Sequence, residues 1–381
     1  MRGALGLLLL FALTAPIAGA TTYVVRPDGL GDFPFIQDAI NAAVNGDVIE
    51  LADGIFNGPR NWNLDYLGKA ITIRAQGGPG SVCIIDCWNM ARGVSFHSGE
   101  GPQSRLEGVA ILNGNSASLG YCGGGCFIQG SSPTISGCEF SYCYGPYGGG
   151  VYCQSGSLTL TNCVFRDNYG GGLYVSAYGS VLATDCTFEG NTSDRGAGAR
   201  VDYGTATFTR CTFQGNWCHY AGAGIYSSDG SQTTLTGCTF VRNGSDSAPD
   251  GVVVASGGQV HLENTIVAFG SRAAGVRCNG GEVILSCCDV YGNEGGDCVG
   301  CIAGQCGLNG NISLDPQFCD AGGGDFTLES DSPCGPDYNP DCGLIGAFGI
   351  GCADAASVPE PPADGPPGTA TSWGALKALF R

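Results

Sequence analysis

The chain has 381 residues, of which 67 are glycine, and only 13% of its residues are charged. Acidic residues outnumber basic ones by 34 to 16, so the net charge is −18 at pH 7. Phosphate backbones and anionic membranes attract the opposite charge, so we exclude nucleic acid and anionic lipid as partners. The glycine content is typical of a repetitive chain, and the 43% of hydrophobic residues is enough to bury a core.

The first 20 residues have the features of a signal peptide. Arg2 precedes an apolar run at 7–13, and residues 18–20 read Ala-Gly-Ala, a small-residue cleavage pattern. The run is shorter than the roughly 18 apolar residues of a spanning helix. We therefore expect cleavage after Ala20, a secreted or surface-displayed protein, and no transmembrane span. All 22 cysteines follow this point, and in an oxidising compartment some should form disulfides whose pairing cannot be deduced from spacing.

Residues 21–352 are predicted to form one folded body that begins with a short helix. Ile36, Ala39, Ile40 and Ala43 fall on one face of that helix. Such a face would cover the open end of an apolar core. Early strands are expected at 48–51, 70–73 and 83–86.

A repeated motif, Cys-x-apolar-x-x-Asn, organises the middle of the chain. Complete or degenerate copies start at 138, 163, 186, 211, 238, 264 and 288, which are 23 to 27 residues apart. Each repeat also contains a strand after a glycine cluster and a second strand that runs into the cysteine. Three short β-runs in about 25 residues predict one coil of a three-faced β-helix. The alternative, a leucine-rich repeat, would require a Leu-x-x-Leu-x-Leu spacing that the sequence lacks.

Stacking the coils in register would place equivalent residues above one another at about 4.8 Å. Two structural ladders are then expected, and phenylalanines would stack beside the first of them. The cysteine ladder consists of Cys163, Cys186, Cys211 and Cys238, and the asparagine ladder consists of Asn168, Asn191, Asn216 and Asn243. Buried thiols behave as small hydrophobic groups, so we interpret both ladders as core and not as chemistry.

These residues resemble those of bacterial right-handed parallel β-helix repeat proteins, whose fold is shared with pectate lyases. The Phe-x-x-Asn rungs are similar to those of polymorphic outer-membrane and autotransporter passengers. Residues 28–40 resemble the first segment of pectinesterases, and residues 315–333 resemble a closing segment, so caps are expected at both ends. The resemblance implies an all-β, single-stranded right-handed parallel β-helix with an N-terminal capping helix. The sequence lacks the signature motifs of pectinesterases, polygalacturonases and pectate lyases, which disfavours those three activities.

Strand alternation predicts which residues point outward from the strand after each glycine cluster. One outward column reads Phe127, Tyr152, Tyr174, Arg200, Tyr226, Val253 and Arg277, and the next reads Gln129, Gln154, Ser176, Asp202, Ser228, Ala255 and Asn279. The turns that lead into these strands add Tyr142, Tyr144, Tyr147, Tyr169, Asp194, Arg195, Trp217, Cys218, His219 and Tyr220.

Rings beside hydrogen-bonding groups are suited to the apolar faces and hydroxyls of sugars. This pattern predicts a surface that binds a polysaccharide or another cell-surface partner. The ligand-binding candidates are Phe127, Tyr152, Gln154, Tyr174, Arg200, Trp217, Tyr220 and Tyr226. The alternative is that the tyrosines only stabilise an exposed sheet through neighbouring pairs, as in a structural or adhesive passenger.

Catalysis is a rival hypothesis for the same surface. Arg200, Asp202 and His219 would supply the cation and the base that elimination from a uronic acid requires, as in a polysaccharide lyase or epimerase. An ordinary surface ion pair explains the same residues. The sequence therefore leaves open whether the protein is an enzyme.

No cofactor is expected from the sequence. Cys298, Cys301 and Cys306 have the close spacing of a metal-binding knuckle, but disulfides with nearby cysteines are favoured in an exported protein. We interpret Asp246 and Asp250 first as turn residues, and the alternative is that they bind Ca²⁺, for which no motif is present.

The last residues change abruptly in composition. Residues 353–370 are rich in proline, glycine and alanine and are expected to form a linker. In residues 371–381, Trp373, Leu376, Leu379 and Phe380 recur at helical spacing. We predict that this amphipathic segment docks to a sorting or envelope component. The alternative is that it folds back on the helix body.

Overall fold

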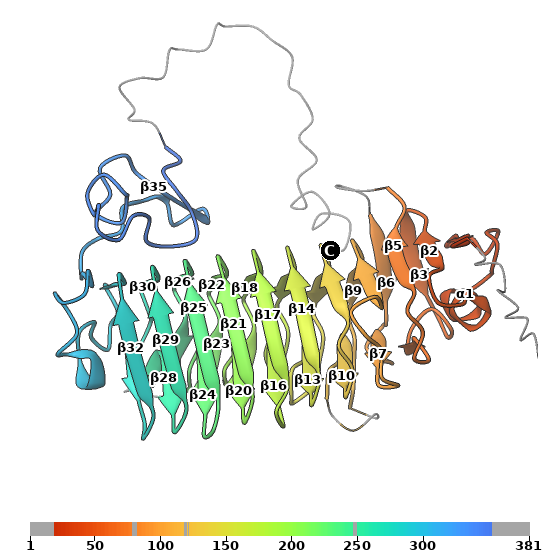
Figure 1. Cartoon of the computed structure of the whole chain (residues 1–381), viewed down its shortest axis with the longest axis horizontal. Coiled ribbons are helices and arrows are strands. Elements are labelled where there is room, and N and C mark those ends of the chain that lie inside the picture. The colour runs from red at the N-terminus through yellow and green to blue at the C-terminus, as the bar shows by residue number, and fades with distance from the viewer. Residues whose placement is uncertain (1–18, 78–81, 118–119, 121, 247–249, 353–381) are drawn as a thin grey trace, which may run out of the picture.

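The computed structural model describes residues 19–77, 82–117, 120, 122–246 and 250–352. The expected signal peptide, the linker and the C-terminal amphipathic segment therefore lie outside the described residues. No helix in the described ranges is long and apolar enough to cross a membrane. Figure 1 shows a long stack of coils with one helix, α1 (Ile36–Ala42), at its N-terminal end.

The coils form a right-handed parallel β-helix of about 10 turns with about 26 residues per turn, which confirms the predicted fold class. Each turn contributes one strand to each of three sheets. The first sheet contains β1 (Thr22–Val25), β2 (Val48–Leu51), β5 (Thr72–Ala75), β8 (Arg105–Glu107), β11 (Thr134–Ser136), β14 (Ser157–Thr161), β17 (Ser180–Thr184), β21 (Thr205–Thr209), β25 (Gln232–Thr236), β29 (Gln259–Glu263) and β32 (Glu282–Ser286). The second contains β4 (Leu64–Asp65), β7 (Val94–Phe96), β10 (Cys126–Gln129), β13 (Val151–Gln154), β16 (Leu173–Ser176), β20 (Ala199–Asp202), β24 (Ile225–Ser228), β28 (Asp250–Ser256) and β31 (Ala273–Cys278). The third contains β3 (Gly54–Asn57), β6 (Cys83–Asp86), β9 (Ala110–Leu112), β12 (Glu139–Ser141), β15 (Val164–Arg166), β18 (Thr187–Glu189), β22 (Thr212–Gln214), β26 (Thr239–Val241), β30 (Ile266–Ala268) and β33 (Asp289–Tyr291).

The corner between the first and third sheets is made by one residue in the left-handed conformation. It stands immediately before the motif cysteine, as at Asn162 (φ 53°) and Asp185 (φ 55°), and glycine takes the place at 137 and 237. Asparagine, aspartate and glycine tolerate this conformation better than other residues do. A single such residue per coil turns the chain sharply from one sheet into the next.

The last glycine of each cluster is required for a different reason. A Cβ at Gly198 would lie 2.7 Å from the Phe213 ring, and one at Gly224 would lie 2.6 Å from the Phe240 ring. These glycines let the backbone approach the phenylalanine stack closely. The stack is continuous, because ring centroids are 4.6 Å apart from Phe188 to Phe213 and 4.4 Å apart from Phe213 to Phe240.

Both predicted ladders are present in the core. The ladder cysteines are buried and form no disulfide within the described residues. The Cys163 thiol donates a hydrogen bond to the carbonyl oxygen of Ile135 at 3.5 Å. In the asparagine ladder, Asn168 Nδ2 donates to Asn191 Oδ1, Asn191 to Asn216, and Asn216 to Asn243, each at 2.9 Å. The side chains therefore satisfy one another inside the turn.

The N-terminal end is closed as predicted, because Ile36, Ala39 and Ile40 of α1 are fully buried against the first coil. The early strands lie at the predicted positions 48–51 and 83–86, whereas the strand predicted at 70–73 is β5, two residues later.

The C-terminal end differs from the expectation. Residues 297–312 cover the last coil, where Ile302 of η1 (Gly300–Ile302) is buried in the main core. Disulfides Cys278–Cys301 and Cys298–Cys306 hold this cap. The three knuckle cysteines are thus paired in disulfides, as the sequence favoured.

The segment expected to close the end instead packs on the flank of the coils, where Figure 1 shows β35. This lateral module contains β34 (Phe318–Asp320) and β35 (Asp325–Leu328), and disulfides Cys287–Cys342 and Cys319–Cys352 secure it. Its apolar side chains cover Val241, Ile266 and Ala268, which are outward residues of β26 and β30. Apolar residues at these outward positions provide the surface on which the module packs.

Candidate functional site

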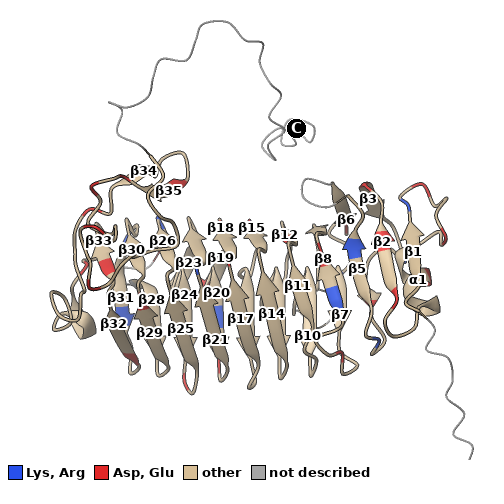
Figure 2. Cartoon of the chain, turned by 45° about the horizontal axis from the view of Figure 1, so that its top comes forward, with Lys and Arg blue, Asp and Glu red and all other residues tan. Residues whose placement is uncertain are grey.

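The outward side of β10, β13, β16, β20, β24, β28 and β31 forms the strand face. Charged residues are sparse on its central strands (Figure 2). Parallel pairing aligns Phe127 with Tyr152, Tyr152 with Tyr174, Tyr174 with Arg200, and Arg200 with Tyr226. The predicted column is therefore present from Phe127 to Tyr226.

The column continues differently from the prediction. Tyr226 pairs with Val254, and Val254 pairs with Arg277, whereas Val253 pairs with the inward Ile225. Ala255 likewise points inward, and Ser256 takes its predicted place beside Ser228. Residues 252–255 are all apolar, so alternation could not indicate which of them face outward.

The aromatic column is a packed stack rather than an open platform. Tyr152 is 8% exposed and Tyr226 is 7% exposed. The rings of Phe127 and Tyr152 stack at 5.9 Å, and Tyr152 meets Tyr174 edge to face at 5.3 Å. The stacking alternative raised by the sequence thus accounts for this column.

Arg200 and Asp202 support the stack from beside it. The Arg200 guanidinium lies 2.6 Å from Asp202 Oδ2 and 4.9 Å from the centroid of the Tyr174 ring. Tyr174 donates its hydroxyl to the same carboxylate oxygen at 2.5 Å. Burial and this carboxylate raise the pKa of Tyr174. The pair is largely buried, with side-chain exposures of 24% and 11%, so it acts as a structural link.

The second outward row is also occupied by internal contacts. Gln129 Nε2 donates to Gln154 Oε1 at 3.2 Å, and Ser176 Oγ donates to the Tyr152 hydroxyl at 2.8 Å. These bonds leave the Gln129 and Gln154 amides at the surface of the strand face with further hydrogen-bonding capacity.

His219 contacts a different carboxylate. It lies on β23 (Trp217–Ala221), which pairs with β19 (Thr192–Arg195) and β27 (Gly244–Ser245) at the edge of the strand face. His219 Nδ1 is 2.6 Å from Asp246, which also accepts from Trp217 Nε1 at 3.0 Å. The hydrogen bond from His219 lowers the pKa of Asp246. The structure therefore joins Arg200 to Asp202 and His219 to Asp246, so the predicted catalytic residues form two separate pairs.

An aromatic row, Tyr144, Tyr169 and Trp217, follows the same edge. Backbone bridges connect Tyr144 to Tyr169 and Tyr169 to Thr192, which pairs in turn with Trp217. The rings of Tyr144 and Tyr169 stack at 5.1 Å and are 36% and 49% exposed. These rings present the open aromatic surface that the sequence assigned to the strand face.

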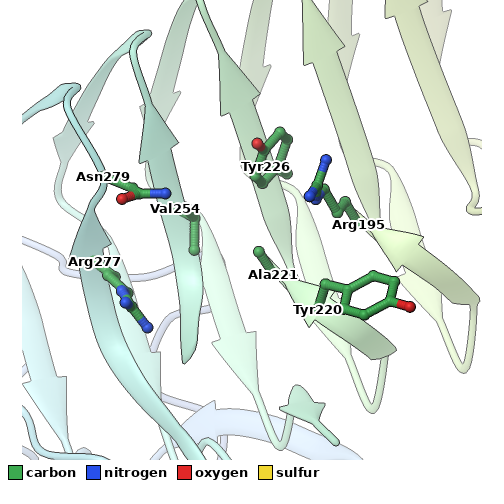
Figure 3. A pocket seen from close by; sticks show the side chains of 7 residues that line it. All are labelled: Arg195, Tyr220, Ala221, Tyr226, Val254, Arg277 and Asn279. Carbon is green, nitrogen blue, oxygen red and sulfur yellow. The ribbon is translucent and has the colours of Figure 1, made fainter. Parts of the chain in front are cut away.

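A hollow of about 190 Å³ opens where the column reaches Val254. Figure 3 shows the residues that line this arginine pocket: Arg195, Tyr220, Ala221, Tyr226, Val254, Arg277 and Asn279. The Arg195 guanidinium lies 5.7 Å from the Tyr226 ring centroid and 6.0 Å from that of Tyr220. Val254 is the short side chain between Tyr226 and Arg277, and this makes room for the hollow.

Sequence reasoning did not select Arg195 or Arg277 as site residues. The signal for Arg277 was its place in the outward column, two rungs beyond Tyr226. The signal for Arg195 was its place among the polar turn residues that lead into the strand face, and the structure places it at the end of β19 in the edge sheet. No group of three or more His, Cys, Asp or Glu residues in the described ranges is placed to hold a metal ion.

Comparison with known proteins identifies a family and two solved structures that are similar to this chain. The chain matches the model of the family described as "Right handed beta helix region" over residues 69–204 and 150–313. Among solved structures, it is similar to the pectate lyase Pel9A, with 13% identity, a TM-score of 0.49, and coverage of 88% of this chain and 98% of that chain. It is also similar to a pectin methylesterase from carrot, with 15% identity, a TM-score of 0.36, and coverage of 82% and 94%. The curated proteins include no match to this chain.

Proposed function

This chain belongs to the right-handed β-helix family, and we propose that it binds a glycan along the strand face and its aromatic row. The observation that carries the proposal is the exposed, stacked pair Tyr144 and Tyr169, held in register by backbone bridges between neighbouring coils. Aromatic rings bind the apolar faces of sugars, and neighbouring polar groups hydrogen-bond to their hydroxyls.

The β-helix provides a rigid support for such binding. Backbone pairing between successive coils sets the positions of Tyr144, Tyr169 and Trp217, so little conformational entropy would be lost when a ligand binds. The row runs along the helix axis, and Thr192 takes the place of a ring between Tyr169 and Trp217. A polysaccharide lying along that axis would contact several rings at once.

A secreted or cell-surface location is part of the proposal. Four disulfides support it, because such bonds persist in oxidising compartments. Polysaccharides of an envelope or matrix are the ligands available there. The C-terminal segment at 371–381 remains the proposed docking tag for a sorting or envelope component.

Binding without catalysis is the function we propose. Arg200 and Tyr174 both contact Asp202 Oδ2, and His219 is paired with Asp246. Arg200 Nε and Asp202 Oδ1 are buried without a hydrogen-bond partner among the described residues. A polysaccharide lyase or epimerase would need these groups to face a substrate together. The rival enzyme hypothesis therefore enters only as an outcome of the test.

The test is a binding screen of the full chain against neutral and acidic polysaccharides by affinity electrophoresis and calorimetry. We expect the double variant Tyr144→Ala/Tyr169→Ala to lower affinity about tenfold, which corresponds to about 1.4 kcal/mol, because both apolar ring surfaces that a sugar would cover are removed. Tyr338→Ala is the control, because Tyr338 is 61% exposed on the lateral module.

The outcomes separate the three functions. Binding that depends on Tyr144 and Tyr169 but not on Tyr338 supports the proposal. Release of unsaturated or reducing ends during the screen would replace it with an enzymatic function. Absence of binding to every polysaccharide would leave a structural or adhesive role.

A further inference from the structure

We infer that the arginine pocket takes an anionic substituent of the glycan, a carboxylate or a sulfate ester, by direct contact with Arg195 and Arg277. This inference rests on the proposed glycan-binding function and adds the charge of the ligand to it. The guanidinium groups would contact the anion directly, without a cation between the protein and the ligand.

The first support is the pairing of arginines elsewhere in the chain. Seven arginines form ion pairs with carboxylates: Arg26, Arg60, Arg74, Arg105, Arg166, Arg200 and Arg210. Arg195 and Arg277 both line the pocket, and neither forms an ion pair within the described part of the chain. Arg242 and Arg272 also form no ion pair within the described residues, but neither lines the pocket. The pocket is therefore set apart by two guanidinium groups without carboxylate partners in one place.

The second support is the geometry of the pocket. Arg195 lies over the rings of Tyr220 and Tyr226, which orient its guanidinium by cation–π contact. Arg277 lies on the other side of Val254, as Figure 3 shows, and Asn279 adds an amide. Guanidinium groups match the oxygens of carboxylates and sulfates with paired hydrogen bonds. A group held above Val254 would lie between both arginines.

The third support is the anchoring of the pocket. Cys278, the residue after Arg277, is joined to Cys301 by a disulfide that ties the end of β31 to the terminal cap. Arg200 also contacts Tyr226, and its guanidinium lies 5.8 Å from the ring centroid. The backbone beside Arg277 and the ring of Tyr226 are therefore set before an anion binds, which reduces the entropy lost on binding.

The charge of the ligand follows from the cost of covering these arginines. A neutral sugar over the pocket would remove water from two guanidinium groups without supplying a counter-charge, which is unfavourable. An anionic substituent supplies that charge. Because the whole chain is strongly negative, the polymer would be repelled elsewhere and retained at this pocket.

The experiment compares matched polymers on the full chain, in EDTA and at two NaCl concentrations. Polygalacturonate is paired with its carboxyl-reduced form, and dextran sulfate is paired with dextran. We expect at least one anionic member to bind about tenfold more tightly than its neutral partner, and the difference to shrink at high salt. Which pair shows the difference identifies the carboxylate or the sulfate ester as the anion.

The variants are Arg195→Gln and Arg277→Gln, which remove the charge and retain a polar side chain. Each should weaken binding of the preferred anionic polymer about tenfold and leave the neutral polymer unchanged. Arg242→Gln is the matched control, because it removes one positive charge from an exposed turn after β26, on the third sheet.

An equal loss with Arg242→Gln would show a general charge effect and overturn the inference. Equal binding of neutral and anionic polymers that still depends on Tyr144 and Tyr169 would overturn the inference alone. Failure to bind any polymer would overturn the proposed function and this inference with it.

Discussion

Asn191 is a middle member of the buried asparagine ladder, and its replacement by alanine tests how much the ladder stabilises the coils. Asn191 Oδ1 accepts from the backbone nitrogen and from Nδ2 of Asn168, at 3.1 and 2.9 Å. Its Nδ2 donates to Phe165 O and to Asn216 Oδ1, both at 2.9 Å. Asn191→Ala would thus remove four hydrogen bonds at a position with no solvent exposure.

The magnitude follows from the hydrogen bonds that are lost. Asn168 Nδ2 still donates to Phe140 O, and Asn216 Oδ1 still accepts from the backbone nitrogen of residue 191. Four buried hydrogen bonds disappear, at about 1 kcal/mol each, so we expect the free energy of unfolding to fall by about 4 kcal/mol. Asn243 stands at the end of the ladder, where three side-chain bonds link it to Asn216 and Phe213. Asn243→Ala should therefore cost about 3 kcal/mol on the same basis.

Equilibrium urea unfolding of the full chain, followed by circular dichroism, measures these losses. Asn57→Ala is the control, because Asn57 is exposed and its side chain makes no hydrogen bond within the described residues. Its effect should lie within about 0.5 kcal/mol. A loss below about 1 kcal/mol for Asn191→Ala would refute the reasoning, because the ladder would then contribute no more than surface residues do.

Three further predictions concern titration, thiol access and the lateral module. Burial raises the pKa of Asp289 to about 7, so the native state holds this proton more tightly than the unfolded chain. The resulting stabilisation, present in full below about pH 4, should be lost as pH rises to about 7, and Asp289→Asn should remove that dependence in urea unfolding at several pH values. Cys211 is buried, and burial raises the pKa of its thiol, so an alkylating reagent should modify it in urea but not in the native chain; equal modification in both would contradict this. Replacing Cys287 and Cys342 by serine should increase hydrogen exchange in the lateral module and leave the central coils unchanged, because their disulfide joins the module to the coils.

The repeat is where the sequence was most informative. A motif that recurs every 23 to 27 residues must present the same side chains to the coil above and the coil below. Columns of identical residues then follow from stacking alone, as at Phe213 and Asn216. Each coil packs on its immediate neighbours, so a local pattern contains nearly all the information that the core requires.

The outward positions were predicted less completely. Alternation placed Tyr152 and Tyr226 on the correct side of their strands, but both are covered by neighbouring side chains. Exposure depends on what lies beside a residue in the next coil, which alternation within one strand does not describe. The shift from Val253 to Val254 has a related cause, because backbone pairing with Ile225 decides the register in a run without polar residues.

The sequence by itself determined the β-helix, its ladders, its capping helix and the presence of disulfides, because each depends on a local pattern repeated in neighbouring coils. Only the tertiary structure decided which cysteines pair, that residues 313–352 pack on the flank, and that Arg195 from the edge sheet lines the same pocket as Arg277 from the strand face. The physical reason is that these contacts join segments outside the repeat, and their geometry depends on loop paths that no periodic pattern records.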